Sequence, residues 1–103
     1  MPQAARPDLR RLFKQLNARC FNNELPLVRL CYTDLTEEFA WGLFWPCDRH
    51  IDLCETVPAE EVQGILLHEM VHLKQNYRGK AMHHDRYFRK ELARCLTIIG
   101  LPT

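Results

Sequence analysis

Apolar residues recur along the first quarter of this chain at three- and four-residue spacing, which is typical of a helix. The pattern begins at Pro7 or Asp8 and ends near Asn22, and its apolar positions are Leu9, Leu12, Phe13, Leu16 and Cys20. Three strand-like runs follow at residues 27–32, 40–45 and 51–54. The turn residues 46–49 separate the last two runs, so we expect these to form a hairpin.

Helical spacing returns in the second half of the chain. One helix is predicted after Thr56, a suitable N-cap, with Pro58 in its first turn. A polar loop at 76–81 separates it from a last helix over residues 84–99, which Gly100 ends. The order helix, sheet, helix, helix predicts an α+β fold in a single domain of residues 1–103.

The helix after Thr56 has apolar residues on more than one face. One stripe is formed by Val62, Leu66, Met70, Leu73 and Tyr77, and further apolar residues lie at other angles around the helix: Ile65, Leu67 and Val71. We therefore expect this helix to be buried on most sides.

The same helix carries the pattern H-E-x-x-H at His68, Glu69 and His72. Residues four apart lie one turn above each other, so the two imidazoles can share one tetrahedral Zn²⁺. Glu69 lies about 100° around the helix from His68, where its carboxylate can reach a water on the metal without becoming a ligand. This arrangement is typical of the general base in metal-assisted peptide hydrolysis. A zinc site would also explain a glutamate on a buried helix.

A catalytic zinc usually takes three protein ligands, so a third must come from elsewhere. The candidates downstream are His83, His84, Asp85 and Glu91. The short metzincin spacing is excluded, because Arg78 stands where it requires a histidine. Only one of His83 and His84 can reach the metal, because adjacent residues at a helix start point in different directions.

The motif and its surroundings resemble the SprT-like (Spartan-type) zinc metallopeptidases. In that family the third ligand is a histidine four residues before an aromatic, usually as H-G-x-x-F/W, and His84 and Phe88 match this pattern. Asp85 stands in place of the usual glycine. The segment 21–26, Phe-Asn-Asn-Glu-Leu-Pro, also resembles the family's F-N-x-x-L-P, so the resemblance covers residues 21–88.

The resemblance implies a zincin-like minidomain with an N-terminal helix, a small three-stranded sheet, the zinc-site helix and a C-terminal helix. It also implies that the strand at 40–45 is the edge over the cleft, where a peptide substrate could add in extended form. It favours His84 as third ligand. Glu91, with eighteen residues between it and His72, is the gluzincin-like alternative.

The cysteines and the lengths of the apolar segments indicate the cellular compartment in which the protein is expected. Five cysteines without a C-x-x-C pair indicate neither a zinc ribbon nor a redox motif, and we expect mostly buried thiols in a reducing compartment. The first seven residues show no apolar core followed by a cleavage site, the pattern of a signal peptide. No apolar run is long enough to span a membrane. We therefore expect a soluble, cytoplasmic protein without a membrane partner.

Charge is unevenly distributed along the chain. The net charge is +1, but residues 1–33 carry +4, residues 34–72 carry −8 and residues 73–103 carry +5. The basic segment from Lys74 to Arg94 could be a solvated helix face or a surface for DNA. Spartan-type enzymes degrade proteins crosslinked to DNA, so the resemblance favours the interpretation of this segment as a DNA-binding surface.

These patterns together predict a zinc-dependent endopeptidase for a peptide or protein substrate, in which His68, His72 and His84 bind Zn²⁺. Glu69 would deprotonate the attacking water and later pass the proton to the leaving amine. Tyr77 or Tyr87 would polarise the oxyanion. The alternative is a zinc-stabilised module that binds DNA or a protein, with latent or no peptidase activity.

Overall fold

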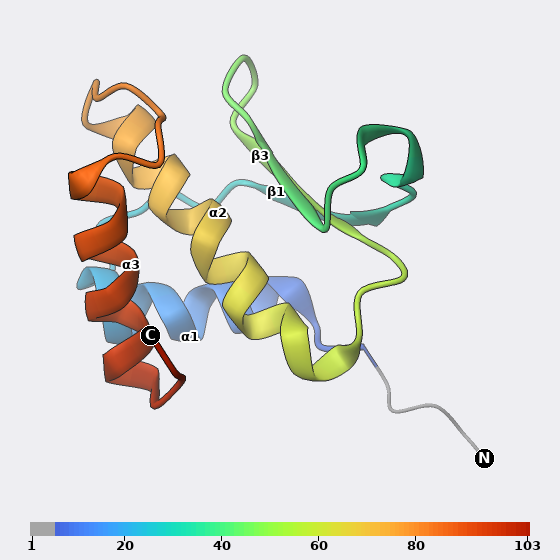
Figure 1. The fold of residues 1–103 in the computed structure, drawn as a ribbon, viewed down its shortest axis with the longest axis horizontal. Helices are drawn as coiled ribbons and strands as arrows, with labels where there is room; N and C mark the ends of the chain where they lie inside the picture. Colours follow the sequence, from blue (N-terminus) through green and yellow to red (C-terminus); the bar gives the residue numbers. More distant parts are fainter. Residues whose placement is uncertain (1–5) are drawn as a thin grey trace.

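Three α-helices and one three-stranded sheet make up residues 6–103, the part of the chain that the computed structural model describes (Figure 1). The helices are α1 (Leu9–Phe21), α2 (Val62–Tyr77) and α3 (Arg86–Ile99), and the strands are β1 (Arg29–Thr33), β2 (Gly42–Trp45) and β3 (His50–Cys54). Two short 3₁₀ helices, η1 (Thr36–Glu38) and η2 (Ala59–Glu61), precede β2 and α2. The predicted α+β class and order of elements are confirmed, whereas the prediction of no signal peptide falls largely on residues 1–5, outside this part.

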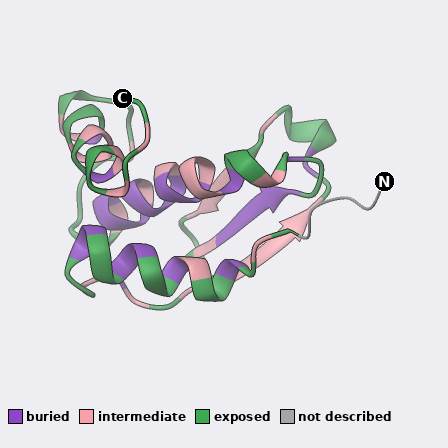
Figure 2. Cartoon of the chain, turned by 90° about the horizontal axis from the view of Figure 1, so that it is seen from below, coloured by how far each residue is buried: buried purple, intermediate pink, exposed green. Residues whose placement is uncertain are grey.

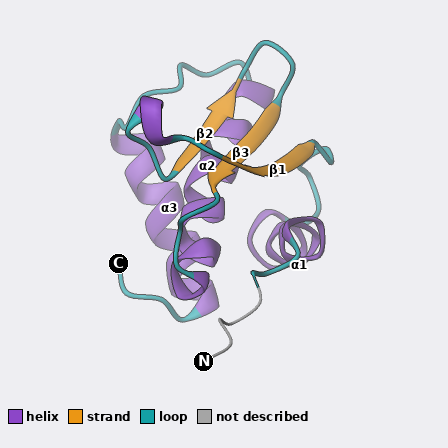
Figure 3. Cartoon of the chain, turned by 90° about the vertical axis from the view of Figure 1, so that its right-hand side faces the viewer, coloured by secondary structure: helices purple, strands orange, loops and turns teal. Residues whose placement is uncertain are grey.

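The sheet has the order β1-β3-β2, so β2 is an edge strand, as predicted (Figure 3). Strand β1 runs parallel to β3, and β2 runs antiparallel to it with Gly42 opposite Leu53. The Cys54 N–H donates to the Trp41 carbonyl over 2.8 Å just before β2. Because antiparallel pairs alternate, the backbone polar groups of Gly42 and Phe44 must point away from β3, toward the open side of this edge.

Helix α2 lies at the centre of the core, where it contacts the sheet, α1 and α3 (Figures 1 and 3). Ile51 and Leu53 of β3 are fully buried and cover it from the sheet side. Its own fully buried apolar residues are Val62, Leu66, Leu67, Met70, Val71 and Leu73. Figure 2 shows the same distribution, with α2 and the central strand mostly buried. The expectation of burial on most sides is therefore confirmed, except at Tyr77, which is 49% exposed at the very end of the helix.

Aspartate side chains cap the starts of two helices, and a glycine ends one of them. Asp8 caps α1 by accepting a hydrogen bond from the Arg11 N–H over 3.0 Å. Asp85 caps α3 in the same way, accepting from the Phe88 N–H over 2.9 Å, and Gly100 ends α3 in the left-handed conformation with φ of 79°. The predicted start of α3 at residue 84 was therefore two residues early, because the extended backbone of Asp85 separates His84 from the helix.

The predicted cap of α2 and two strand starts were also wrong. The Thr56 hydroxyl lies 3.1 Å from the Cys54 thiol instead of capping a helix, and η2 leads into α2 at Val62. Strand β1 begins at Arg29 rather than at residue 27, because its partner β3 begins opposite it at His50. Strand β2 begins at residue 42 rather than 40, because the preceding 3₁₀ turn ends in a left-handed residue at 39.

A network of buried and half-buried charges joins the three helices. The Lys74 ammonium of α2 lies 3.4 Å from Glu24, in the loop after α1, and 3.3 Å from Glu91 of α3. Arg78 donates to Glu24 over 2.7 Å, and Arg94 pairs with Glu91. Three residues of the predicted basic segment are thus engaged in ion pairs, of which Lys74 is buried and Arg78 and Arg94 are exposed.

Candidate metal centre

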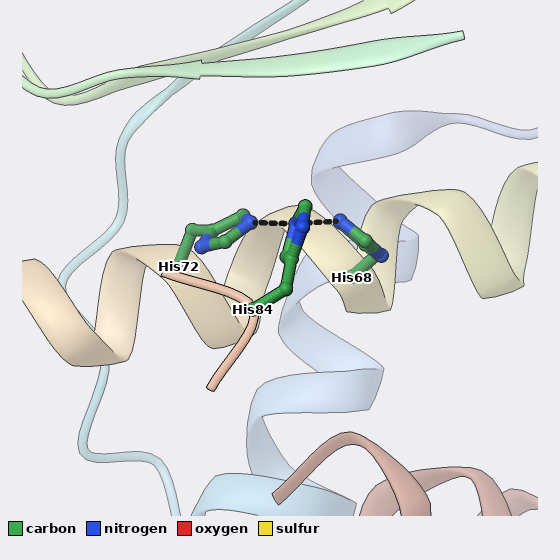
Figure 4. Close-up of side chains that lie close together, drawn as sticks. All are labelled: His68, His72 and His84. Atoms are coloured by element: carbon green, nitrogen blue, oxygen red, sulfur yellow. Dashed lines mark hydrogen bonds between the residues drawn. The ribbon is translucent and has the colours of Figure 1, made fainter. Parts of the chain in front are cut away.

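Three histidine side chains converge on one point above α2. His68 and His72 lie one turn apart on α2, and His84 comes from the loop between α2 and α3. The Nε2 atom of His84 lies 3.2 Å from that of His68 and 3.0 Å from that of His72 (Figure 4). Within residues 6–103, these three side chains form the one group whose nitrogen, sulfur or carboxylate atoms lie close enough together to bind a metal ion.

The chain around His84 is held from several sides. Asp85 caps α3 directly after it, and the Arg89 guanidinium donates to the His84 carbonyl over 3.1 Å. The buried Phe88 ring packs against all three imidazoles, with ring centroids 4.6–4.8 Å apart. Asp85 therefore supplies a cap where the SprT-like pattern has glycine, and Phe88 forms a floor beneath the cluster.

The three ring nitrogens cannot all be satisfied by hydrogen bonds to one another, whereas a bound cation would satisfy all of them. The Nε2 atom of His84 faces two other ring nitrogens, and a single proton on it could not satisfy both of them. One Zn²⁺ at 2.0–2.1 Å from each nitrogen would place tetrahedral ligands about 3.3 Å apart, close to the distances observed.

Burial keeps two of the imidazoles in the neutral form that a metal requires. Burial, with smaller contributions from His72 and His84, lowers the pKa of His68 to about 4. Burial also lowers the pKa of His72, although a hydrogen bond to Gln75 opposes this shift. Both rings are therefore neutral at pH 7 and can offer a lone pair to a metal.

Glu69 lines the same cavity as the three histidines but is not one of the cluster. The cavity has a volume of about 240 Å³ and is also lined by Gly42, Leu43, Phe44 and Met82. Burial raises the pKa of Glu69 to about 7, against the effect of a hydrogen bond from the Phe44 backbone N–H. The carboxyl is thus held between α2 and the open edge of β2, where it titrates near neutrality.

The other residues singled out by their spacing lie elsewhere. Glu91 contacts Lys74 and Arg94 in the charge network, and His83 is exposed and directs only its backbone carbonyl inward. Tyr77 and Tyr87 do not line the metal cavity, and the Tyr87 hydroxyl is buried without a hydrogen-bond partner. The structure thus brings His84, not Glu91, to His68 and His72, and neither tyrosine lines the cavity.

Two residues that line or support the site were not singled out by the sequence patterns. Gly42 faces Glu69 from the edge strand, and this contact depends on how β2 packs on α2. Gln75 lies three residues after His72 and accepts from its Nδ1 over 2.8 Å. Helical spacing would have placed Gln75 on the same face as His72, but its link to the 83–84 segment is a tertiary contact.

Comparison with known proteins identified no family: no family model matches the chain, and no curated protein matches it. A separate finding concerns membranes. None of the helices within residues 6–103 has both the length and the apolar character needed to cross a bilayer.

Proposed function

We propose that this chain is a zinc-dependent endopeptidase of SprT type, with Zn²⁺ held by His68, His72 and His84. The observation that carries the proposal is the placement of these three imidazoles and the Glu69 carboxyl in one cavity beside a free strand edge. Histidine nitrogens are preferred zinc ligands, and three of them leave one coordination position for water or substrate.

The chemistry divides between the metal and Glu69. Zinc, when bound, acts as a Lewis acid that lowers the pKa of a water molecule and polarises the substrate carbonyl. Glu69 takes a proton from the attacking water and later passes it to the leaving amine. The pKa of Glu69, about 7 without a metal, would fall beside a cation, so the carboxylate would be ionised and ready to accept the proton.

The edge strand β2 supplies a surface for the substrate backbone. The backbone polar groups of Gly42 and Phe44 point away from β3, and the Phe44 N–H is directed to Glu69. Within residues 6–103 no strand pairs with this side of β2, so the remaining groups could pair with an extended peptide, which would then lie along the cavity that contains the histidines. We therefore propose peptide or protein substrates rather than small esters or nucleotides.

The test combines metal analysis with hydrolysis of an unstructured protein substrate. Wild-type protein should bind about one zinc per chain and cleave the substrate. Glu69→Gln should bind zinc as well and remain folded but lose hydrolysis, because the amide cannot accept the proton. Full activity in Glu69→Gln, or no zinc bound by the wild type, would contradict the proposal.

The second candidate is a zinc-stabilised module that binds DNA. It is favoured by four exposed basic residues that flank His84 in the sequence and form no ion pair within the described residues: Lys80, Arg86, Arg89 and Lys90. The two candidates differ in one measurement, since only the endopeptidase hydrolyses a peptide bond. A DNA-binding peptidase would combine both activities and act on proteins bound to DNA.

A further inference from the structure

Gln75 is fully buried in α2, and both ends of its side-chain amide are engaged. Its Oε1 atom lies 2.8 Å from Nδ1 of His72, and its Nε2 atom donates to the His83 carbonyl over 2.9 Å. A buried amide is stable when its oxygen and nitrogen both have partners, as they do here. The side chain therefore connects one histidine of the cluster to the residue directly before another.

The direction of these hydrogen bonds follows from the His83 carbonyl, which can only accept. The NH₂ group of Gln75 must face this carbonyl, so the oxygen must face His72. An oxygen beside Nδ1 can only accept, so Nδ1 of His72 carries the proton. The lone pair of the neutral ring is then on Nε2, the atom that lies 3.0 Å from His84.

We propose that Gln75 is a positioning residue of the metal centre, which fixes the tautomer of His72 and ties the His84 segment to α2. The proposal rests on the metal centre of the proposed function but not on peptidase activity. Groups that hold the second ring nitrogen of a histidine ligand orient the ring and make it a better ligand. Here one amide would serve two ligands, because it also restrains the chain next to His84.

Zinc affinity of the purified protein, measured by competition with a chelator, tests this role. Gln75→Met keeps the size of the side chain but removes both hydrogen bonds, and it should weaken zinc binding by about 10- to 100-fold. Gln63→Met is the matched control, because Gln63 is the other glutamine of α2 and takes no part in the hydrogen bonds to His72 and His83. It should bind zinc like the wild type.

A purely structural role is distinguished by two further readouts. Affinities are compared only for variants that circular dichroism shows to be folded without zinc, so lost stability alone does not lower them. Gln75→Glu restores an acceptor for His72 but cannot donate to His83, and it should bind zinc more tightly than Gln75→Met. The visible absorption of the Co²⁺ form should change in Gln75→Met, because it reports the ligand geometry.

A measurement on the wild type covers the case in which Gln75→Met does not fold. Imidazole ¹⁵N shifts of the zinc-free protein should show His72 protonated at Nδ1, and a ring protonated at Nε2 would overturn the proposal. Wild-type zinc affinity in a folded Gln75→Met, or equal affinity in Gln75→Glu and Gln75→Met, would overturn it too. Absence of zinc binding in the wild type would instead reject the metal centre itself.

Discussion

Gly42 faces Glu69 so closely that the strand has no room for a side chain there. A Cβ atom on Gly42 would lie 3.2 Å from Oε2 of Glu69 and only 2.8 Å from Cγ2 of Ile65. The branched Ile65 side chain cannot move aside freely in a packed interface, so β2 and α2 would have to separate. The absence of a side chain at Gly42 therefore sets the distance between the edge strand and the proposed general base.

Gly42→Ala should reduce peptide hydrolysis without removing zinc. We expect a loss of up to about 100-fold in kcat, because displacement of β2 or Glu69 misplaces the base relative to the substrate. Overpacking should also lower stability by about 1–3 kcal/mol. The measurements are single-turnover hydrolysis, zinc content and urea unfolding.

Gly64→Ala is the matched control for this variant. A Cβ atom at Gly64 would meet only Leu101, at an ordinary distance of 3.9 Å. The substitution should leave hydrolysis unchanged and raise stability by about 0.5–1 kcal/mol, because alanine is the better helix former. Equal activity of Gly42→Ala and Gly64→Ala would show that the Gly42 contact does not position the base.

His84→Ala should lower zinc affinity more than any other single change outside α2. The loss should exceed the roughly 10- to 100-fold that removal of an outer hydrogen-bond partner causes, because a ligand itself is removed. His83→Ala, at the exposed neighbour, should bind zinc normally. Isothermal titration with Zn²⁺ measures all three proteins under the same conditions.

Glu91→Gln separates the two possible third ligands. It should keep zinc affinity but destabilise the zinc-free protein, because Lys74 and Arg94 lose a partner in the charge network. A large loss of zinc affinity in Glu91→Gln, with little change in His84→Ala, would reverse the ligand assignment.

The contribution of Glu24 to stability should depend on pH. The hydrogen bond from Arg78, with the nearby charge of Lys74, lowers the pKa of Glu24 below its ordinary 4.5, although burial opposes the shift. A carboxyl with a lowered folded-state pKa stabilises the fold above its unfolded pKa and loses this effect as pH falls through the folded pKa. The stability difference between wild type and Glu24→Gln should therefore be larger at about pH 7 than at about pH 3.

Urea unfolding at the two pH values measures this difference. Glu37→Gln, on the exposed η1 turn, is the control and should change stability little at either pH. If the stability difference between wild type and Glu24→Gln stays constant or grows as the pH falls, the ion pairs of Glu24 do not stabilise the folded state.

The exposed basic residues that flank His84 in the sequence should bind DNA through its phosphates. Replacing Lys80, Arg86 and Lys90 by Glu should weaken binding to single-stranded DNA, and wild-type affinity should fall steeply with salt. Arg89 is left unchanged because it donates to the His84 carbonyl. Fluorescence anisotropy at several salt concentrations gives both quantities.

A charge-matched triple on α1 controls for net charge. Arg10, Arg11 and Lys14 are exposed, and their replacement by Glu reverses the same number of charges. If both triples weaken DNA binding equally, the attraction comes from net charge and not from the residues that flank His84. If the wild type binds no DNA even at low salt, these residues form a solvated surface.

The parts of this protein that could be predicted from the sequence are those that local geometry decides. The four-residue spacing of His68 and His72 places both rings on one face of any helix, wherever that helix packs. The stop signal of the last helix at Gly100 is likewise local, because a glycine reaches the left-handed conformation at little cost. Helix and strand periodicities gave the α+β class for the same reason.

Contacts between distant segments were decided only by the tertiary structure. His84 and Glu91 were both acceptable by spacing, and the packing of α3 against α2 brought the first to the cluster and the second to Lys74. The same packing divided the basic segment, pairing some of its charges with Glu24 and Glu91 and leaving others without an ion pair within the described residues.

The residues that support the site, Gly42 and Gln75, were also placed only by the tertiary structure. Gly42 is opposite Glu69 because β2 pairs with β3 in one register and then packs on α2, and Gln75 bonds to His83 because the loop returns over the helix. A helical turn spans about four residues, so sequence spacing determines which groups share a face within that range. Beyond it, burial of the shared core decides which segments meet, and that choice depends on the whole chain at once.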